Sequence, residues 1–275
     1  MSKKLLFFDI DGTLIAFDGT FPESAKKALK KAQENGHEIF LCSGRNRCQI
    51  DPVLAEFGFD GYVTSAGASA EYHGTIIFDS YMEPQKYKEL VSYFEKNHMA
   101  YIIQCSDKVL MTTKSRDIIR ESFRMYRKRM VGDVVFPDQV LDDEPFEFYK
   151  THPNAEKACY FMSDTPVTKI ASDLSHIFDV TKMSYNDGTD KNGEITQMGI
   201  TKAVGMEKMA EHLGLTKEDV IAFGDGPNDF EMMDYAGFSV AMGNAIDELK
   251  KSADYVTSDI KEDGILNALK HLNLI

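Results

Sequence analysis

The sequence predicts an α/β protein in which a core with a parallel sheet is interrupted by an inserted α+β domain. In the first and last thirds of the chain, short apolar runs alternate with helix-like segments, which is typical of parallel βαβ units. The middle third loses this rhythm and mixes helices with short strands. A length of 275 residues also favours two domains of about 100–200 residues each. We therefore expect residues 1–83 and 188–275 to form the core and residues 84–187 the inserted domain.

The first predicted strand is the apolar run Leu5–Phe8, which is long enough for a strand that is buried on both faces. It ends at two carboxylates, Asp9 and Asp11, followed by Gly12. Unpaired charge is costly to bury, so packing does not explain these acids. In open α/β sheets, ligands bind at the carboxyl ends of the strands. The two aspartates are therefore the first candidates for a reactive centre.

Two more strands are predicted in the first third, and each ends at small or polar residues. We expect a helix over residues 22–33, a strand over 38–42, a helical segment over 50–57 and a strand over 61–64. The strand over 38–42 ends at Ser43-Gly44-Arg45, and the strand over 61–64 ends at residues 65–68. Small residues at successive strand ends leave a concave edge where a ligand can approach the backbone.

The middle third is predicted to contain hairpin-like strands and three helices. The expected strands are residues 70–72, 75–78, 100–104, 108–112, 146–150, 158–162 and 177–182, and the expected helices are 84–97, 115–129 and 167–175. Two turn signals, Asn186-Asp187-Gly188 and Asn192-Gly193, mark the return to the core. There we expect helices over 201–213, 231–236, 245–252 and 264–272 and strands over 220–223, 239–242 and 255–257.

Composition excludes several classes of partner. The chain has 31 basic and 44 acidic residues, a formal net charge of −13, which argues against nucleic acid or an anionic membrane as the main partner. No window approaches the roughly 18 apolar residues of a membrane span, and the N-terminus does not resemble a signal peptide. The four cysteines have no zinc-ligand spacing, and free thiols fit a reducing cytoplasm. We expect a cytoplasmic protein, and the oligomeric state is left open.

Polar side chains from four predicted strand ends or helix starts should meet at one edge of the sheet. Besides Asp9, Asp11 and Ser43, they are Lys202 at a helix start and the acids and amide of Gly224-Asp225-Gly226-Pro227-Asn228-Asp229. A carboxylate can act as a nucleophile, and a second one as acid and then base. Converging oxygen donors suit Mg²⁺, and a serine hydroxyl, an N–H group and a lysine suit a phosphoryl group. Each motif alone has a structural explanation, but their order on strand ends is hard to obtain by chance.

These motifs resemble those of the haloacid dehalogenase (HAD) superfamily, and its Cof-like hydrolases in particular. The matching segments are Asp9-Ile10-Asp11-Gly12-Thr13-Leu14, Ser43-Gly44-Arg45, Lys202 and Gly224 to Asp229, with a long insertion after the third strand. The resemblance implies a Rossmann-like core, a mobile α/β cap and Mg²⁺-dependent phosphatase activity. It is specific in the motifs and loose in the inserted segment.

The resemblance also implies a role for each motif residue. Asp9 would attack phosphorus and become an aspartyl-phosphate, and Asp11 would protonate the leaving oxygen and later activate water. Mg²⁺ would be bound by the Asp9 carboxylate, the Asp11 backbone carbonyl and Asp225. Asn228 or Asp229 would lie in the metal shell or just behind it.

The phosphoryl group would be held by Ser43, Gly44 and Lys202, and Arg45 is a possible substrate contact. One departure from the family pattern is Ala66, which stands where the family often has asparagine in a loop that faces the substrate. In the cap, Asn186 and a basic helical segment are weak candidates for substrate recognition; the arginines of that segment are Arg116, Arg120, Arg124, Arg127 and Arg129.

The predicted function is hydrolysis of a small phosphorylated metabolite, such as a sugar phosphate or a cofactor-like phosphate. Dehalogenases of the superfamily lack the second acid, here Asp11, and related transport ATPases have threonine there and membrane spans. Two alternatives stay open. A phosphosugar mutase would keep Asp11, and a phosphometabolite-binding regulator would keep the pocket without turnover.

Overall fold

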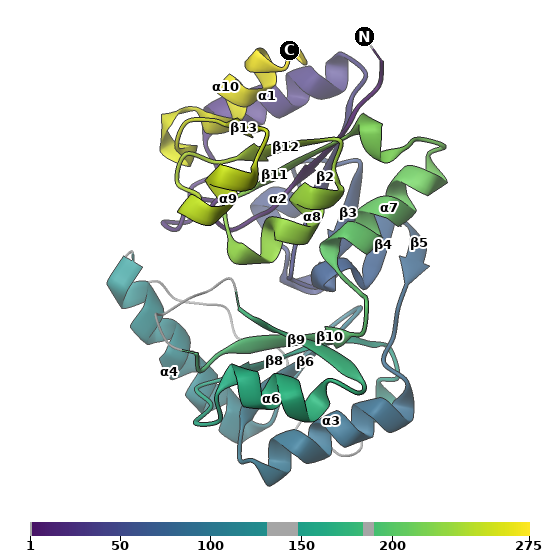
Figure 1. Ribbon diagram of the computed structural model, residues 1–275, viewed down its shortest axis with the longest axis vertical. Coiled ribbons are helices and arrows are strands. Elements are labelled where there is room, and N and C mark those ends of the chain that lie inside the picture. The colour runs from purple at the N-terminus through teal and green to yellow at the C-terminus, as the bar shows by residue number, and fades with distance from the viewer. Residues whose placement is uncertain (1, 131–147, 184–189) are drawn as a thin grey trace. The chain divides into compact units, whose positions relative to one another are not determined.

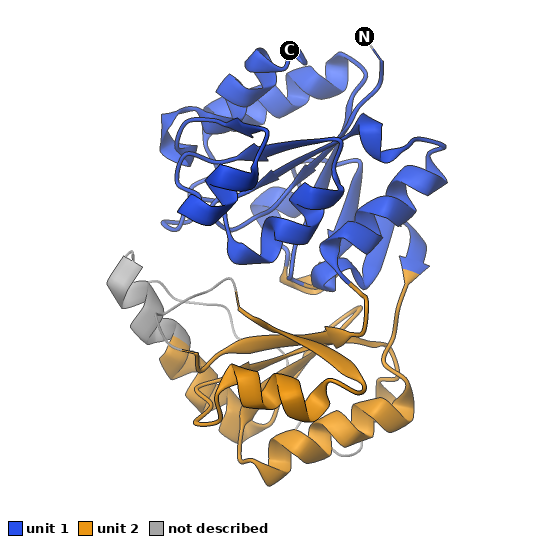
Figure 2. Ribbon diagram, in the orientation of Figure 1, with its two compact units in different colours: residues 1–45, 50–78, 201–275 blue, residues 46–49, 79–200 orange. Residues whose placement is uncertain are grey.

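The structure is a computed structural model that describes residues 2–130, 148–183 and 190–275. The chain forms two compact units (Figure 2). The core unit consists of residues 1–45, 50–78 and 201–275, and the inserted unit of residues 46–49 and 79–200. The predicted inserted domain, 84–187, lies within the inserted unit, which is longer at both ends.

Within the described residues, the core unit contains one eight-stranded sheet, in the order β13-β12-β11-β1-β2-β3-β4-β5 (Figure 1). The run from β13 to β3 is parallel, and β4 pairs antiparallel with β3. The strands are β1 Leu5–Phe8, β2 Glu38–Cys42, β3 Gly61–Thr64, β4 Ser69–Tyr72, β5 Thr75–Asp79, β11 Val220–Gly224, β12 Phe238–Ala241 and β13 Tyr255–Val256. The predicted α/β core with a parallel sheet is therefore confirmed.

Helices cover both faces of the core sheet, which explains why β1 is apolar at every position. Leu6 and Phe8 pack with α1, α2 and α10 on one face, whereas Leu5 and Phe7 pack with α7, α8 and α9 on the other. The core helices are α1 Glu23–Glu34, α2 Pro52–Ala55, α7 Lys202–His212, α8 Phe230–Tyr235, α9 Asp247–Ser252 and α10 Gly264–His271. β1 lies between β11 and β2, so its carboxyl end is at the middle of the parallel edge.

The inserted unit has a five-stranded antiparallel sheet, in the order β7-β6-β8-β10-β9, among the residues that the structure describes. Its strands are β6 Ala100–Cys105, β7 Val109–Leu110, β8 Ala155–Phe161, β9 Phe178–Lys182 and β10 Gly193–Gln197. Its helices are α3 Pro84–Lys96, α4 Thr113–Met130, α5 Phe148–Thr151 and α6 Val167–Leu174. Apolar residues of α3 and α6 cover one face of this sheet, and Ile119 of α4 packs on the other.

Two sequence predictions in this region are wrong. The strand β10, Gly193–Gln197, was not predicted, and it pairs with β8 and β9, so the inserted unit continues to residue 200. Its short and mostly polar sequence lacks a clear apolar pattern. The strand predicted over 146–150 is helical from Phe148 onward, where α5 packs against α3. Aromatic residues favour strands, but tertiary contacts override that weak preference.

No helix in the described parts of the chain has the length and apolar character needed to cross a membrane.

Candidate active site

Asp9 is the first residue after β1, and the sheet itself holds it in place. Its N–H donates to the carbonyl of Phe223 on β11 at 3.0 Å, and the residue is only 5% exposed. The chain then turns tightly, because the carbonyl of Ile10 accepts the N–H groups of Leu14 and Ile15 at 3.0 and 2.8 Å. This turn leaves Asp11 exposed. The two predicted catalytic acids therefore lie in very different surroundings.

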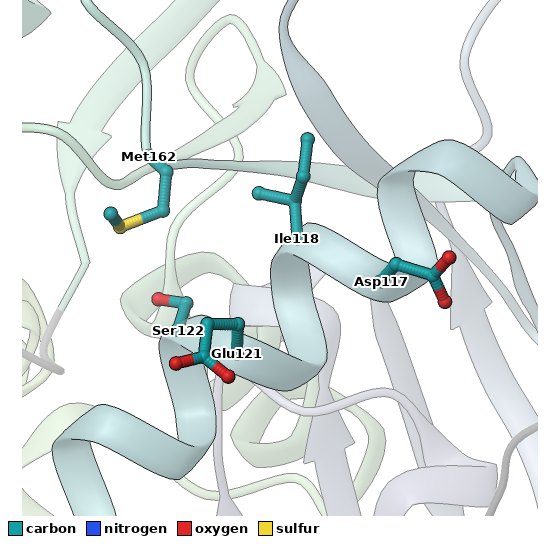
Figure 3. A pocket seen from close by; sticks show the side chains of 5 residues that line it. All are labelled: Asp117, Ile118, Glu121, Ser122 and Met162. Atoms are coloured by element: carbon teal, nitrogen blue, oxygen red, sulfur yellow. The ribbon is translucent and has the colours of Figure 1, made fainter.

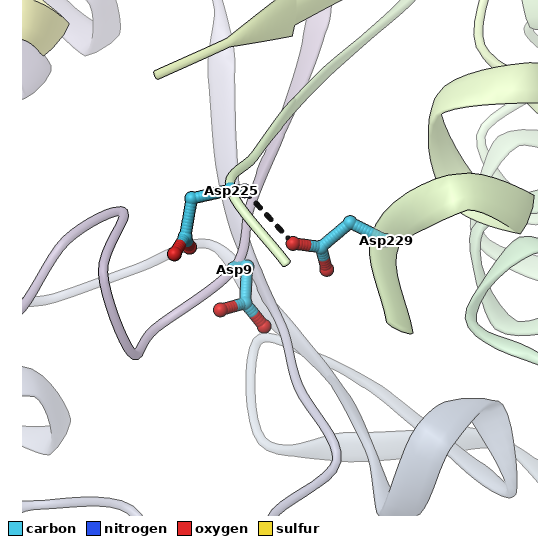
Figure 4. A group of neighbouring side chains, drawn as sticks. All are labelled: Asp9, Asp225 and Asp229. Atoms are coloured by element: carbon cyan, nitrogen blue, oxygen red, sulfur yellow. Dashed lines mark hydrogen bonds between the residues drawn. The ribbon is translucent and has the colours of Figure 1, made fainter. Parts of the chain in front are cut away.

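Asp225 and Asp229 follow β11 and join Asp9 in a buried acidic cluster (Figure 4). One carboxylate oxygen from each residue lies within 4.8 Å of the other two. The Oδ2 atom of Asp229 accepts the backbone N–H of Asp225 at 2.9 Å and that of Gly226 at 3.0 Å. Asp229 therefore shapes the loop that carries Asp225. Asn228, predicted beside it, is half-buried in the 3-10 turn Pro227–Asp229.

Lys202, the first residue of α7, reaches this cluster. Its Nζ atom lies 2.5 Å from Oδ1 of Asp9 and 2.6 Å from Oδ1 of Asp229, and the residue is 3% exposed. Two glycines let the start of α7 come so close. A Cβ on Gly67 would overlap the backbone of Thr201, and one on Gly205 would overlap Val63. Gly67 lies among the small residues predicted to form a concave edge after the strand over 61–64, whereas Gly205 had no predicted role.

The charges of the cluster do not cancel. In the described part of the chain, three buried carboxylates face one ammonium group, which leaves two negative charges in excess. Burial and the charge of Asp229 raise the pKa of Asp9 to about 7, although Lys202 acts in the opposite direction. Burial, Asp229 and Asp9 likewise raise the pKa of Asp225 well above its usual range. Burial alone would lower the pKa of Lys202, but the charges of Asp229 and Asp9 raise it well above its usual range. A divalent cation would balance this excess, so the donor set fits Mg²⁺.

The loop after β1 is shaped around Asp225. Gly12 has a φ of +92°, and a Cβ there would overlap the carboxylate of Asp225. The hydroxyl of Thr13 donates to Oδ1 of Asp225 at 2.9 Å. The side-chain amide of Asn244 donates to the carbonyl of Gly12 at 2.8 Å, and its oxygen accepts the N–H of Ile260 at 3.0 Å. Thr13 lies within a predicted motif but had no role assigned to it, whereas Asn244 was not predicted and no local pattern marks it.

Ser43 and Gly44 follow β2, as predicted, in a loop joined to the loop after β3. The carbonyl of Ser43 accepts the N–H of Ala66 at 3.0 Å, and the carbonyl of Arg45 accepts the N–H of Ser65 at 2.8 Å. Ser65 and Ala66 have φ values of +50° and +57°. Asparagine tolerates this left-handed conformation better than alanine does. The departure at Ala66 therefore changes backbone preference as well as the side chain.

Arg45, predicted as a possible substrate contact, binds two carboxylates of the core unit. Its Nε and Nη2 atoms donate to the two oxygens of Asp11 at 3.1 and 2.7 Å, and its Nη1 donates to Oδ2 of Asp51 at 2.7 Å. Burial opposes the charge, but the two aspartates raise the pKa of Arg45. Asp51 was not a predicted site residue.

The weak candidates in the inserted unit gain no support. Arg116 pairs with its neighbour Asp117 at 3.1 Å. The side chains of Arg124, Arg127 and Arg129, and all of Asn186, lie outside the described residues. A hollow of about 370 Å³ on this unit has an almost wholly apolar accessible surface and contains none of the predicted residues (Figure 3); its lining residues are Asp117, Ile118, Glu121, Ser122 and Met162.

Several known proteins with similar sequences and structures are phosphatases by name. The sequence pattern of the haloacid dehalogenase-like hydrolases matches residues 6–269. YkrA of Bacillus subtilis, which carries a provisional phosphatase name, is 29% identical over 275 residues, 100% of both chains. YcsE of the same organism, a 5-amino-6-(5-phospho-D-ribitylamino)uracil phosphatase, is 26% identical over 98% of this chain and 95% of its own. The structure of BT4131, a HAD subclass IIB sugar phosphatase, has a TM-score of 0.78 and 27% identity and covers 99% of this chain and 100% of its own.

Proposed function

The chain belongs to the haloacid dehalogenase-like hydrolases and is a phosphatase of that superfamily, and we propose that it hydrolyses a small phosphorylated metabolite with Mg²⁺ through an aspartyl-phosphate. The observation that carries this proposal is the buried carboxylate of Asp9, which lies at a strand end with the ammonium group of Lys202 at 2.5 Å. A carboxylate that only bound a ligand would not need this arrangement.

The proposed reaction uses Asp9 and Asp11 in turn. A carboxylate oxygen of Asp9 forms a bond to phosphorus while the bond to the leaving oxygen breaks, and Asp11 gives that oxygen its proton. Asp11 then takes a proton from water, whose oxygen bonds to phosphorus and releases phosphate and free Asp9. Lys202 holds the nucleophile, and together with Ser43 and Gly44 it would offset charge on the phosphoryl oxygens.

The residues that would hold Mg²⁺ are the carboxylates of Asp9 and Asp225 and the backbone carbonyl of Asp11. When bound, the ion would neutralise negative charge on the transferred group. Both oxygens of Asp229 already accept hydrogen bonds, from Lys202 and from two backbone N–H groups. We therefore place Asp229 behind the metal ligands, as the residue that orients them.

A sugar-like phosphate ester is the substrate class that two of the similar proteins favour. BT4131 is described as a sugar phosphatase, and YcsE acts on a phosphoribityl compound by name. Both descriptions are of phosphate esters on a polyhydroxylated carbon chain. This supports a substrate of that class here.

The test is phosphate release from p-nitrophenyl phosphate and from a panel of sugar phosphates, with Mg²⁺ and with EDTA. We expect EDTA to abolish turnover and Asp9→Asn to lower kcat by about 10⁴-fold or more, because the nucleophile is lost. Glu23→Gln, which removes an exposed carboxylate paired with Lys26 on α1, is the control and should leave kcat unchanged. Equal turnover by wild type and Asp9→Asn would refute the proposed nucleophile. An isomerised phosphosugar in place of phosphate would identify a mutase.

A further inference from the structure

We propose that Arg45 and Asp51 are positioning residues that hold the carboxylate of Asp11 for both of its proton transfers. The proposal rests on the role of Asp11 given under the proposed function. It adds a residue, Asp51, that neither the sequence motifs nor that reaction includes.

The geometry is that of a guanidinium group clamped between two carboxylates. Nε and Nη2 of Arg45 form a fork on Asp11, with distances of 3.1 and 2.7 Å to its two oxygens. Nη1 is left for Asp51, whose Oδ2 atom lies at 2.7 Å. A bidentate arginine–carboxylate pair restricts the carboxylate in both distance and orientation, which a lysine does not do. Asp51 in turn restricts the arginine.

Asp11 needs such a clamp, because its surroundings do not hold its side chain. The side chain of Asp11 is 47% exposed, whereas that of Asp9 is 7% exposed and is held by Lys202. A carboxylate on an exposed turn samples several rotamers, and proton transfer requires one of them at hydrogen-bond distance from the reacting oxygen. The fork uses one lone pair on each oxygen of Asp11. The remaining lone pairs can carry or accept the proton.

The placement of Asp51 supports a positioning role over a role in stability. Asp51 directly precedes Pro52, the first residue of α2, and its backbone is extended with φ −57° and ψ 139°. Proline disfavours helical backbone in the residue before it, so this conformation is locally fixed. The side chain of Asp51 is 46% exposed, and exposed ion pairs stabilise folded proteins very little. Its effect should therefore appear in catalysis and not in melting temperature.

The experiment measures the two proton transfers separately with two matched esters, p-nitrophenyl phosphate and phenyl phosphate, in the presence of Mg²⁺. The nitrophenolate leaves without a proton, whereas the phenolate needs one. The ratio of kcat/KM for p-nitrophenyl phosphate to kcat/KM for phenyl phosphate therefore reports the acid step. A burst of nitrophenolate, equal to the enzyme concentration, reports slow hydrolysis of the aspartyl-phosphate, which is the base step. The variants are Asp11→Asn as reference, Arg45→Lys, Asp51→Asn and the double variant, with Glu23→Gln as control.

We expect Asp11→Asn to raise the ratio by about 10²-fold and to produce a burst. Arg45→Lys should raise the ratio by roughly 10-fold, because lysine cannot form the bidentate contact with Asp11. Asp51→Asn should raise it by about 3-fold, because Arg45 stays in place but loses the carboxylate that restricts it. Both should show a partial burst with an unchanged melting temperature. The double variant should have the same ratio as Arg45→Lys alone, because Asp51 acts through Arg45.

Two results would overturn the proposal. In one, Arg45→Lys lowers kcat/KM for both esters by the same factor, which identifies a contact with the phosphoryl group. In the other, Asp51→Asn behaves like the control. If Asp11→Asn itself changes neither the ratio nor the burst, the role of Asp11 in the proposed function is wrong. The positioning role of Arg45 and Asp51 would then be wrong as well.

Discussion

The core unit and the inserted unit both bury ionised side chains, but among the described residues their charges are balanced differently. In the inserted unit, Lys157 on β8 lies 2.8 Å from Glu194 on β10, and their side chains are 1% and 10% exposed. Among the described residues, the ammonium group of Lys157 is paired with the carboxylate of Glu194. In the core unit, Lys202 faces the three carboxylates of the acidic cluster. Burial is similar, and the charge balance is not.

This difference separates an ion pair of the inserted unit from the proposed catalytic centre. A buried pair across neighbouring strands stabilises each of its charges, and removing either partner leaves a buried charge. Among the described residues the acidic cluster has two more carboxylates than ammonium groups. Burial, together with the charge of Asp229, raises the pKa of Asp9. A cation or protons would balance the excess of carboxylates. The three predictions below test whether the two places respond as differently as their charge balance implies.

The largest effect is expected for Lys202→Met. The methionine fills a similar volume but leaves the nucleophile unheld and the acidic cluster without its ammonium group. We expect kcat to fall by about 10³-fold, as for loss of a preorganised charge at a reacting group, and Mg²⁺ to raise the melting temperature more than in wild type. The control is Lys208→Met on the same helix, which removes an exposed ion pair with Glu211. Turnover within a factor of two of wild type would mean that the ammonium group of Lys202 serves structure alone.

Lys157→Met should act on stability instead. It leaves the carboxylate of Glu194 buried and unpaired, so we expect the free energy of unfolding to fall by about 3–5 kcal/mol. Adding Glu194→Leu should restore most of the loss, because the unpaired charge is removed as well. Urea unfolding measures both changes, and Lys169→Met, which breaks an exposed pair with Asp173, should cost under about 0.5 kcal/mol. If Mg²⁺ raised the melting temperature of Lys157→Met by a different amount than that of wild type, the Lys157–Glu194 pair and the acidic cluster would not be independent.

A smaller effect is expected from pH and Mg²⁺ together. The pKa of Asp9 is about 7 in the folded chain without metal, against 3.8 for an ordinary aspartate, so the folded state binds more protons between these values. The contribution of this group to stability is therefore present at low pH and is lost as pH rises through about 7. Mg²⁺ replaces those protons, so it should raise the melting temperature more at pH 8 than at pH 6. Asp9→Asn should reduce that difference, and a Mg²⁺ effect that is equal at both pH values would count against the assignment.

Much of the core could be predicted because its signals are local. The strands β1, β2 and β3 have the predicted bounds, since each is an apolar run that ends at a polar or small residue. Asp9, Lys202, Asp225 and Asp229 were predicted to meet, and the structure places them together. That success came from strand ends, which share one edge in a parallel sheet, and from motif order.

The missed features depend on contacts that no local pattern records. The side chain of Asn244 donates to the carbonyl of Gly12, and the missing Cβ of Gly67 lets the start of α7 come close. Neither contact can be read from the segment around the residue. β10 was missed because a short polar strand becomes recognisable only when its partners β8 and β9 are in place. Arg45 was predicted as a substrate contact, and its engagement by Asp11 and Asp51 was not foreseen.

The sequence by itself determined which groups are available at the strand ends of the core: the carboxylates of Asp9 and Asp11, which we propose as nucleophile and proton carrier, and the ammonium group of Lys202. Only the tertiary structure decided how these groups differ. It buries Asp9 against a lysine 193 residues away and leaves Asp11 on an exposed turn held by Arg45. The physical reason is that the burial of a side chain and the charges around it depend on segments that are distant in the chain and meet only at the folded sheet edge. The order of residues alone does not specify which of these side chains are shielded from water.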